Sequence, residues 1–408
     1  MEALLIPGPI PAMKLIKNSK DHAEMLKLLE ELMIADPKPG TPEDEELELL
    51  AFLIADYESR TVKIPAATPA EAIRFRMEQS GLTQQDLVPF IGSKGRVSEV
   101  LSGKRELTLA MVRKLHEGLG IPLKSLVGDA SAELPPRIDT KGYPVKEMFI
   151  RGFFAAAFGT DWSKVKERAE EMLQKFFNGR QDEPIGAFNR QTTSKKSKVD
   201  VHAVHAWRCR VLDRAAALEL PEYDANALSA DFIKDLTKLS RFPTGPVLAQ
   251  QALHEIGIAV IIEPHLTGTH LDGAAIWHPG GFPVIALTLR HDRLDNFWFT
   301  LFHEIAHVVT HLGPDFGENG FLDSDIDSAS TKNVEREADR FALNSFVSEK
   351  EWDQLSGLHY AEEIQAAAKK LSIHPAVIAG RLRQEANDYR KYRTLIGQGK
   401  VKELFNLD

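Results

Sequence analysis

Hydrophobic positions along most of this chain recur every three to four residues, the spacing that places them on one face of an α-helix. Polar and charged residues fill the positions between them. Stretches rich in proline or glycine separate the periodic segments and indicate turns or linkers. Before residue 130 the pattern predicts helices over 19–35 and 43–57, and four or five short helices within 67–127.

The short helices carry clear boundary signals. Thr68–Glu71 opens the first with a capping threonine, a proline at the first helical position and a capping glutamate. Thr83 is expected to cap the second helix, Gly92 to form a tight turn, and residues 94–101 to form the third. Two short helices joined by a glycine turn are typical of a helix-turn-helix motif.

Basic and hydroxyl residues gather at the start of the third short helix and just after it. This arrangement is typical of a recognition helix that enters the major groove of DNA. The alternative is a small helical domain without a nucleic-acid role. Residues 67–127 carry 9 Lys and Arg against 6 Asp and Glu within an acidic chain, which favours DNA binding. The predicted DNA-contacting residues are Lys94, Arg96, Ser98, Lys104 and Arg105.

The second half mixes helical periodicity with short apolar runs. Runs typical of buried strands occur at 258–262, 273–277 and 284–289, and a His-Pro-Gly-Gly turn signal at 278–281 joins the last two. The expected fold class is therefore α+β, mostly α, with a small sheet in the second half. Further helices are predicted at 161–177, 201–218, 245–255, 360–371 and 375–384.

One helix in this half carries the most specific chemical signal. His303 and His307 are four residues apart, so their side chains share one helix face about one turn apart. Two imidazoles so placed reach a single cation at about 2.0–2.1 Å each, the distance that Zn²⁺ prefers. Glu304 lies beside the metal rather than on it, where it can take a proton from a water molecule.

A second helix around residues 333–345 is expected to pack on the first. Glu335 and Asp339 share one of its faces, whereas Glu337 points elsewhere. Glu335 would complete the three protein ligands that are typical of catalytic zinc sites. Asp339 would accept the free ring N–H of a ligand histidine and fix its tautomer. A solvated charged face is the alternative for this acidic pair.

Two other histidines test the specificity of this signal. His254 also precedes a glutamate, but Ile258 stands where a second histidine would be needed, so we expect no metal role there. On an unbroken helix His311 lies about 12 Å along the axis from His303, too far to share one metal. We expect His311 to support the site from outside the ligand set or to cap the helix.

Composition and charge restrict the possible partners. No apolar run approaches 18 residues and the N-terminus lacks the features of a signal peptide, so we expect a cytoplasmic protein without membrane contact. The single cysteine, Cys209, excludes an internal disulfide and fits a reducing compartment. A net charge of −9 argues against non-specific nucleic-acid binding by the whole surface. Residues 1–60, with 6 basic and 13 acidic residues, predict a solvated scaffold or a face for a basic partner.

The N-terminal motifs resemble a known family. Residues 13–127 resemble HigA-type antitoxins of the Xre-like helix-turn-helix class, and the resemblance rests on the segments 71–78, 81–84 and 96–105. This resemblance implies a repressor that binds operator DNA as a homodimer.

The C-terminal motifs resemble a second family. Residues 230–395 are similar to the ImmA/IrrE family of cytosolic metallopeptidases, through Phe297–His307 and Glu335–Ala342. The resemblance implies a zincin-like domain that cleaves repressors, with His303, His307 and Glu335 as Zn²⁺ ligands and Glu304 as the general base.

Residues 130–230 match neither family. Within them, residues 190–198 predict a polar linker, and a phosphate-contacting segment is the alternative. The expected domains are an acidic helical segment at 1–66, a helix-turn-helix domain at 67–130, a linker and helical middle region at 131–230, a peptidase domain at 231–395 and a tail at 396–408.

Together these patterns predict a DNA-binding transcriptional regulator with a zinc-dependent endopeptidase domain. Its expected partners are operator DNA, a second copy of the chain, and a protein substrate that is a repressor, another regulator or a toxin. The alternative is an antitoxin and repressor whose peptidase fold is a non-catalytic sensor or dimerisation module.

Overall fold

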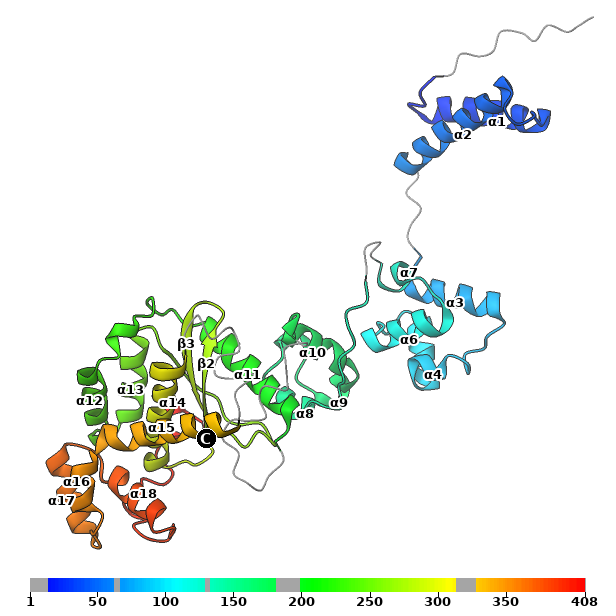
Figure 1. Ribbon diagram of the computed structural model, residues 1–408. Coiled ribbons are helices and arrows are strands. Elements are labelled where there is room, and N and C mark those ends of the chain that lie inside the picture. The colour runs from blue at the N-terminus through cyan, green and yellow to red at the C-terminus, as the bar shows by residue number, and fades with distance from the viewer. Residues whose placement is uncertain (1–13, 62–66, 129–132, 181–198, 313–327, 408) are drawn as a thin grey trace, which may run out of the picture. The chain divides into compact units, whose positions relative to one another are not determined.

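The computed structural model describes residues 14–61, 67–128, 133–180, 199–312 and 328–407. These residues form helices and one three-stranded sheet, which confirms the expected α+β class, mostly α (Figure 1). The chain divides into two compact units, residues 1–107 with 111–134, and residues 108–110 with 135–408. The predicted polar segment 190–198 lies outside the described residues.

The first unit begins with a pair of helices, α1 (Ser19–Ala35) and α2 (Pro42–Thr61). The side-chain oxygen of Asn18 caps α1 by accepting hydrogen bonds from two backbone N–H groups in its first turn. Three acidic residues occupy the first turn of α2, where the helix dipole favours them. The pair packs around a small core of its own, formed by Ile16, Met25, Leu50 and Ile54.

Five helices follow within the predicted helix-turn-helix region. They share one hydrophobic core, in which Ile73, Leu87, Val97 and Leu115 are fully buried. The expected capping box at Thr68 and Glu71 is present. The helices are α3 (Pro69–Ser80), α4 (Val88–Ile91), α5 (Lys94–Leu101), α6 (Leu109–Leu119) and α7 (Leu123–Val127).

The predicted start of the second short helix was wrong. Thr83 does not cap a helix, because residues 84–87 form a turn and α4 begins at Val88. Pro89 has no N–H to donate to the carbonyl of Gln85, so it is favoured in the first turn of a helix and not farther inside. Thr83 instead donates its backbone N–H and its hydroxyl to Asp86, at 2.8 and 2.7 Å.

The second unit is built around a three-stranded sheet. Strands β1 (Ala259–Ile262), β2 (Gly273–His278) and β3 (Phe282–Leu287) lie in the order β1-β3-β2, with β1 parallel and β2 antiparallel to β3. Helix α11 (Val201–Ala216) packs on one face of the sheet and α14 (Leu294–His311) on the other. Because both faces are covered, the strands are nearly continuous apolar runs instead of alternating polar and apolar residues.

The middle region forms a layer on this sheet and is part of the second unit. Its helices bury aromatic residues against α11 and the strands. Arg151 and Arg214 each bind the buried carboxylate of Glu263 at 2.8 Å, just after β1. The helix predicted at 161–177 occurs in pieces. The elements are α8 (Val145–Ile150), η1 (Ala156–Phe158), α9 (Trp162–Val165), η2 (Lys166–Arg168) and α10 (Ala169–Phe177).

The remaining helices surround α14. The segment expected as a C-terminal tail packs into the same core, because Val401 is fully buried and its N–H donates to Asp292 at 2.9 Å. None of the described helices combines the length and the apolar character that a membrane crossing requires. The elements are η5 (Ala225–Ala227), α12 (Ala230–Lys238), η6 (Leu239–Arg241), α13 (Gly245–His254), α15 (Ser328–Phe346), α16 (Glu349–Leu355), α17 (Ala361–Leu371), α18 (Pro375–Glu385) and η9 (Glu403–Phe405).

Candidate metal centre

Helix α14 holds two histidines in an apolar environment. Its residues Leu301, Phe302 and Ile305 are fully buried in the main core of the second unit. Phe302 packs against Phe346 of α15 with ring centroids 4.5 Å apart, which places α15 across α14. His303 and His307 are buried on α14 among these apolar residues, so their imidazole rings need polar partners.

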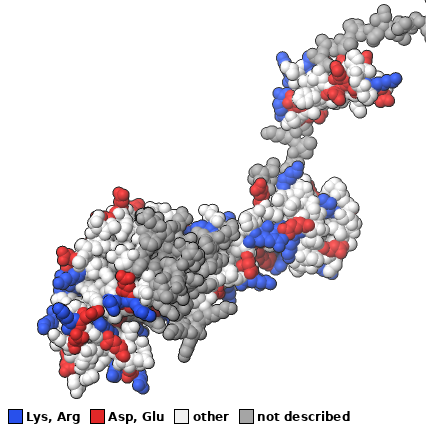
Figure 2. Space-filling view, in the orientation of Figure 1, with Lys and Arg blue, Asp and Glu red and all other residues white. Residues whose placement is uncertain are grey.

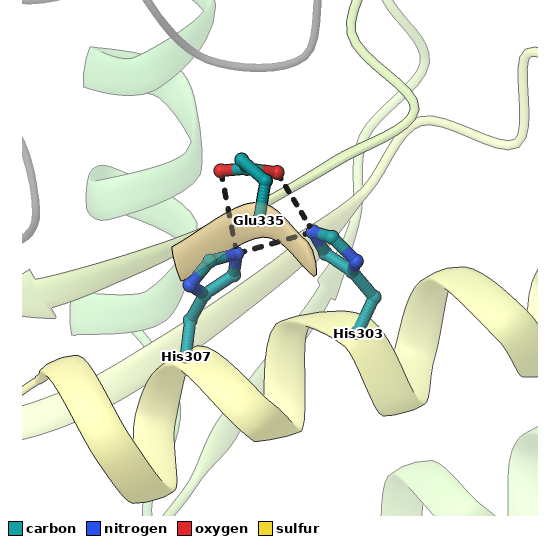
Figure 3. A group of neighbouring side chains, drawn as sticks. All are labelled: His303, His307 and Glu335. Atoms are coloured by element: carbon teal, nitrogen blue, oxygen red, sulfur yellow. Dashed lines mark hydrogen bonds and ion pairs between the residues drawn. The ribbon is translucent and has the colours of Figure 1, made fainter. Parts of the chain in front are cut away.

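The structure brings His303, His307 and Glu335 together. The Nε2 atoms of the two imidazoles are 3.1 Å apart, and the Glu335 carboxylate oxygens lie 3.3 Å from Nε2 of His303 and 3.7 Å from Nε2 of His307. Figure 3 shows both rings rising from α14 toward the carboxylate on α15. Among the described residues, these three form the only cluster of His, Cys, Asp and Glu side chains with this convergence.

These separations suit a tetrahedral metal ion. Ligands at about 2.0–2.1 Å from a tetrahedral centre lie about 3.3–3.4 Å from one another. The two Nε2 atoms lie 3.1 Å apart, and each has one oxygen of the Glu335 carboxylate at 3.3 or 3.7 Å. Two imidazoles and one carboxylate are also a usual donor set for a catalytic zinc ion. The residues present therefore fit such an ion.

Asp339 lies next to this cluster and orients one of its rings. Its carboxylate is 3.0 Å from Nδ1 of His303, so Nδ1–H donates to it and Nε2 faces His307 and Glu335. Burial disfavours a proton on His303, but the bonds with Asp339 and Glu335 outweigh burial and raise the pKa of His303 to about 10. A metal ion at this site therefore competes with a proton.

Glu304 lies on the same helix face, between the cluster and strand β2. Burial raises the pKa of its carboxyl to about 7, although the backbone N–H of Ala275 donates to it. Gly273 permits this approach. A Cβ atom at that position would lie 2.7 Å from Oε1 of Glu304 and 2.7 Å from Cγ2 of Thr300. Glu304 is therefore fixed at the border between α14 and β2.

The other acidic and histidine candidates lie elsewhere. Glu337 is exposed on α15. His254 bonds to the backbone of Val260, whose N–H donates to Nε2 at 3.1 Å. The side chain of His311 lies outside the described residues.

The predicted DNA-contacting residues lie on or next to α5, which Ser93 caps. Lys94, Ser98 and Lys104 are exposed. Arg96 folds back over Gly92, and Arg105 binds Glu99 at 2.5 Å. In Figure 2, Lys and Arg side chains form patches on the helix-turn-helix domain with acidic side chains among them.

Comparison with known proteins agrees with this two-part organisation. Residues 253–406 match the model of the peptidase M78 family, described as the IrrE N-terminal-like domain. The fold and the site thus define a helix-turn-helix region followed by a domain of metallopeptidase type.

The N-terminal region is 38% identical over 114 residues to antitoxin HigA of Escherichia coli K12, covering 26% of this chain and 78% of that protein. The HigA antitoxins of Escherichia coli O6:H1 and Shigella flexneri match to the same extent. Through this region the chain belongs to the HigA antitoxin family.

Proposed function

We propose that this protein is a DNA-binding regulator whose C-terminal domain is a zinc-dependent endopeptidase acting on a specific regulatory protein. The observation that carries the proposal is the convergence of His303, His307 and Glu335, with the carboxylate of Glu304 beside them. A structural metal site is closed by four protein ligands, whereas a catalytic site keeps three and leaves a position open. Three converging ligands with an adjacent carboxylate favour catalysis.

The chemistry that a bound zinc ion supplies is Lewis acidity toward the scissile carbonyl and toward water. Glu304 would take the proton from the attacking water and deliver it to the leaving amine. Burial raises the pKa of this carboxyl above its ordinary value, and a bound cation would lower it again and so favour the carboxylate that accepts the proton. Asp339 would hold His303 in the tautomer that faces the ion.

Strand β2 offers a docking position for the substrate backbone. It lies at one edge of the described sheet. Trp277 pairs with Pro283 of β3, and proline has no backbone N–H to donate. Ala274 and Ile276 pair with residues of β3 that can both donate and accept backbone hydrogen bonds. In antiparallel strands, hydrogen-bonded and non-hydrogen-bonded residue pairs alternate. Gly273, Ala275 and Trp277 belong to the second kind, so their backbone N–H and C=O groups point away from β3. We propose that an extended substrate pairs with this edge, beside Glu304.

The N-terminal region would bind operator DNA through α5, with the chain acting as a homodimer. This part of the proposal rests on the similarity to antitoxins named HigA and on the exposed Lys94, Ser98 and Lys104. The same similarity favours a second candidate function, an antitoxin and repressor in which the peptidase fold is a non-catalytic sensor or dimerisation module.

Purified wild-type and Glu304→Gln protein, each loaded with zinc, would be incubated with the products of the neighbouring genes and with casein. The proposal predicts that wild type cleaves one neighbouring product, that a chelator stops the cleavage and that Glu304→Gln is inactive. Casein should remain intact, because an unrestricted peptidase would damage other proteins of the cell. Intact neighbouring products under every condition would favour the non-catalytic alternative.

A further inference from the structure

One cavity of about 300 Å³ extends from the candidate metal centre into the helical part of the domain. Its lining includes His303, Glu304 and Glu335 at the metal centre. It also includes residues from α16 and α18, which carry none of the proposed ligands or the proposed base. A pocket of this size is large enough for a substrate side chain.

The open surface of this cavity is more apolar than polar, although Asn296, Arg381 and Gln384 also line it. The four helices α14, α15, α16 and α18 all contribute to it. The apolar wall includes Phe299, Leu343, Phe346, Trp352, Val377 and Ile378. Several of these side chains are only partly buried by the protein itself, including Phe299, Leu343 and Val377. Apolar surface left open inside a cavity favours an apolar occupant, because burial removes that surface from water.

Two arginines in the wall have partners within the protein. Arg293 binds Asp295 at 2.9 Å. Arg381 lies over the ring of Trp352, 4.0 Å from its centroid, and its Nε donates to Glu385 at 3.1 Å. The buried Nη1 of Arg381 has no hydrogen-bond acceptor within the described residues, which makes an acidic side chain the rival occupant.

We infer that this cavity is the side-chain pocket of the peptidase site, and that it accepts a large apolar side chain next to the scissile bond. The inference rests on the proposed function and adds a substrate class to it. The Trp352–Arg381 stack, Phe299 and Val377 all line this pocket. A regulator with leucine or an aromatic residue at the cleavage position is therefore the preferred substrate.

The test measures binding and does not need turnover. Zinc-loaded full-length protein would be titrated with four hydroxamates that differ only in the side chain beside the zinc-binding group: isobutyl, benzyl, methyl or carboxyethyl. The isobutyl and benzyl compounds should bind at least roughly tenfold more tightly than the methyl compound, as expected for extra carbon groups in an apolar pocket. Val377→Phe fills the cavity and should abolish this preference. Val309→Phe, the same change at an exposed position of α14 outside the cavity, should preserve it.

Each result decides one question. Equal affinity for all four compounds, or tightest binding of the carboxyethyl compound, would overturn the apolar pocket. Preference that survives in Val377→Phe would place the side chain elsewhere. Metal analysis of the same samples separates the two levels of the proposal: a protein that binds no zinc would sink the proposed function together with this inference, whereas zinc without side-chain preference would sink only the inference.

Discussion

At the scale of single residues, the orientation of His303 depends on a carboxylate outside the proposed ligand set. Asp339 accepts from Nδ1 of His303 at 3.0 Å, while Nε2 faces His307 and Glu335. The Asp339 side chain is half exposed, so water can replace part of its role. The histidine ring would still lose its negatively charged partner.

Asp339→Asn should weaken zinc binding by roughly 10–100-fold, the usual effect of removing such an outer partner. Competition between the protein and a fluorescent chelator measures the affinity. Glu337→Gln, on the same helix and exposed, is the matched control and should bind zinc like the wild type. Identical affinities for all three proteins would remove Asp339 from the account.

At the scale of elements, β2 connects the sheet to the proposed chemistry. Glu304 accepts the N–H of Ala275, and Gly273 leaves room for its carboxylate. The outer N–H of Ala275 thus fixes the proposed base, and the other outer backbone groups of β2 would pair with the proposed substrate. Both roles require that α14 and β2 keep their present spacing.

Gly273→Ala should lower the rate of substrate cleavage by about 100-fold, the cost expected when a reacting group is displaced by about 1 Å. The added Cβ would lie 2.7 Å from the Glu304 carboxylate, so one of them must move. Zinc content should not change. Gly357→Ala, where nothing lies within 4 Å, is the control. Full activity in Gly273→Ala would show that the spacing is not needed.

Helix α5 carries the second element-scale prediction. Arg96→Ala should weaken binding to the operator by about 1–3 kcal/mol if Arg96 contacts a base. Lys104→Ala should weaken binding to all duplexes alike, because a phosphate contact carries no sequence information. Lys124→Ala, an exposed lysine on α7, is the control. Gel-shift titrations with unchanged affinity in both Arg96→Ala and Lys104→Ala would refute the assignment.

Local patterns located most elements and the centre of the site. The helix predicted over 19–35 occurs as α1, and the three strands occur within two residues of their predicted ends. The spacing of His303 and His307 was enough to place both on one face of α14. Such features depend on neighbours one turn or two residues away, which the sequence displays directly.

Features that depend on distant residues were not predicted. Arg151 and Glu263 are 112 residues apart, and their contact attaches the middle region to the sheet. The cavity walls from α16 and α18 likewise meet α14 only in the folded chain. The order β1-β3-β2 depends on strand pairing, which the apolar runs alone do not specify.

At the scale of the whole molecule, one chain would combine the two proposed functions, DNA binding and peptide hydrolysis, and both would benefit from proximity. Attachment to an operator-binding region would raise the local concentration of the peptidase near repressors at the same site. The second candidate substrate is this chain itself, cleaved within residues 128–140. Cleavage of a repressor and cleavage of the chain itself both require a folded second unit. One buried histidine makes the stability of this unit depend on pH.

His205 of α11 is fully buried, bonds to Tyr143 at 3.0 Å and stacks on Phe177. Burial lowers its pKa to about 4, against an ordinary value of 6.5. Between those values the unfolded chain binds more protons than the folded chain, so acidification destabilises the protein. As the pH falls from 7 to 5, protonation of His205 in the unfolded chain should lower the free energy of unfolding by about 2 kcal/mol.

Urea unfolding of wild type and His205→Gln at both pH values measures this contribution. The variant should be less stable at pH 7, because it loses the ring stacking. Its stability should fall less than that of the wild type on acidification. An equal fall in both proteins would show that His205 does not carry the effect.

Zinc content per chain decides whether His303, His307 and Glu335 form a metal site. We expect about one zinc ion per chain in the wild type and in Glu304→Gln, because Glu304 lies beside the proposed ligands and is not one of them. We expect loss of the ion in His303→Ala, His307→Ala and Glu335→Ala. Full zinc in Glu335→Ala would contradict this ligand set, because another side chain would then have to supply the third ligand.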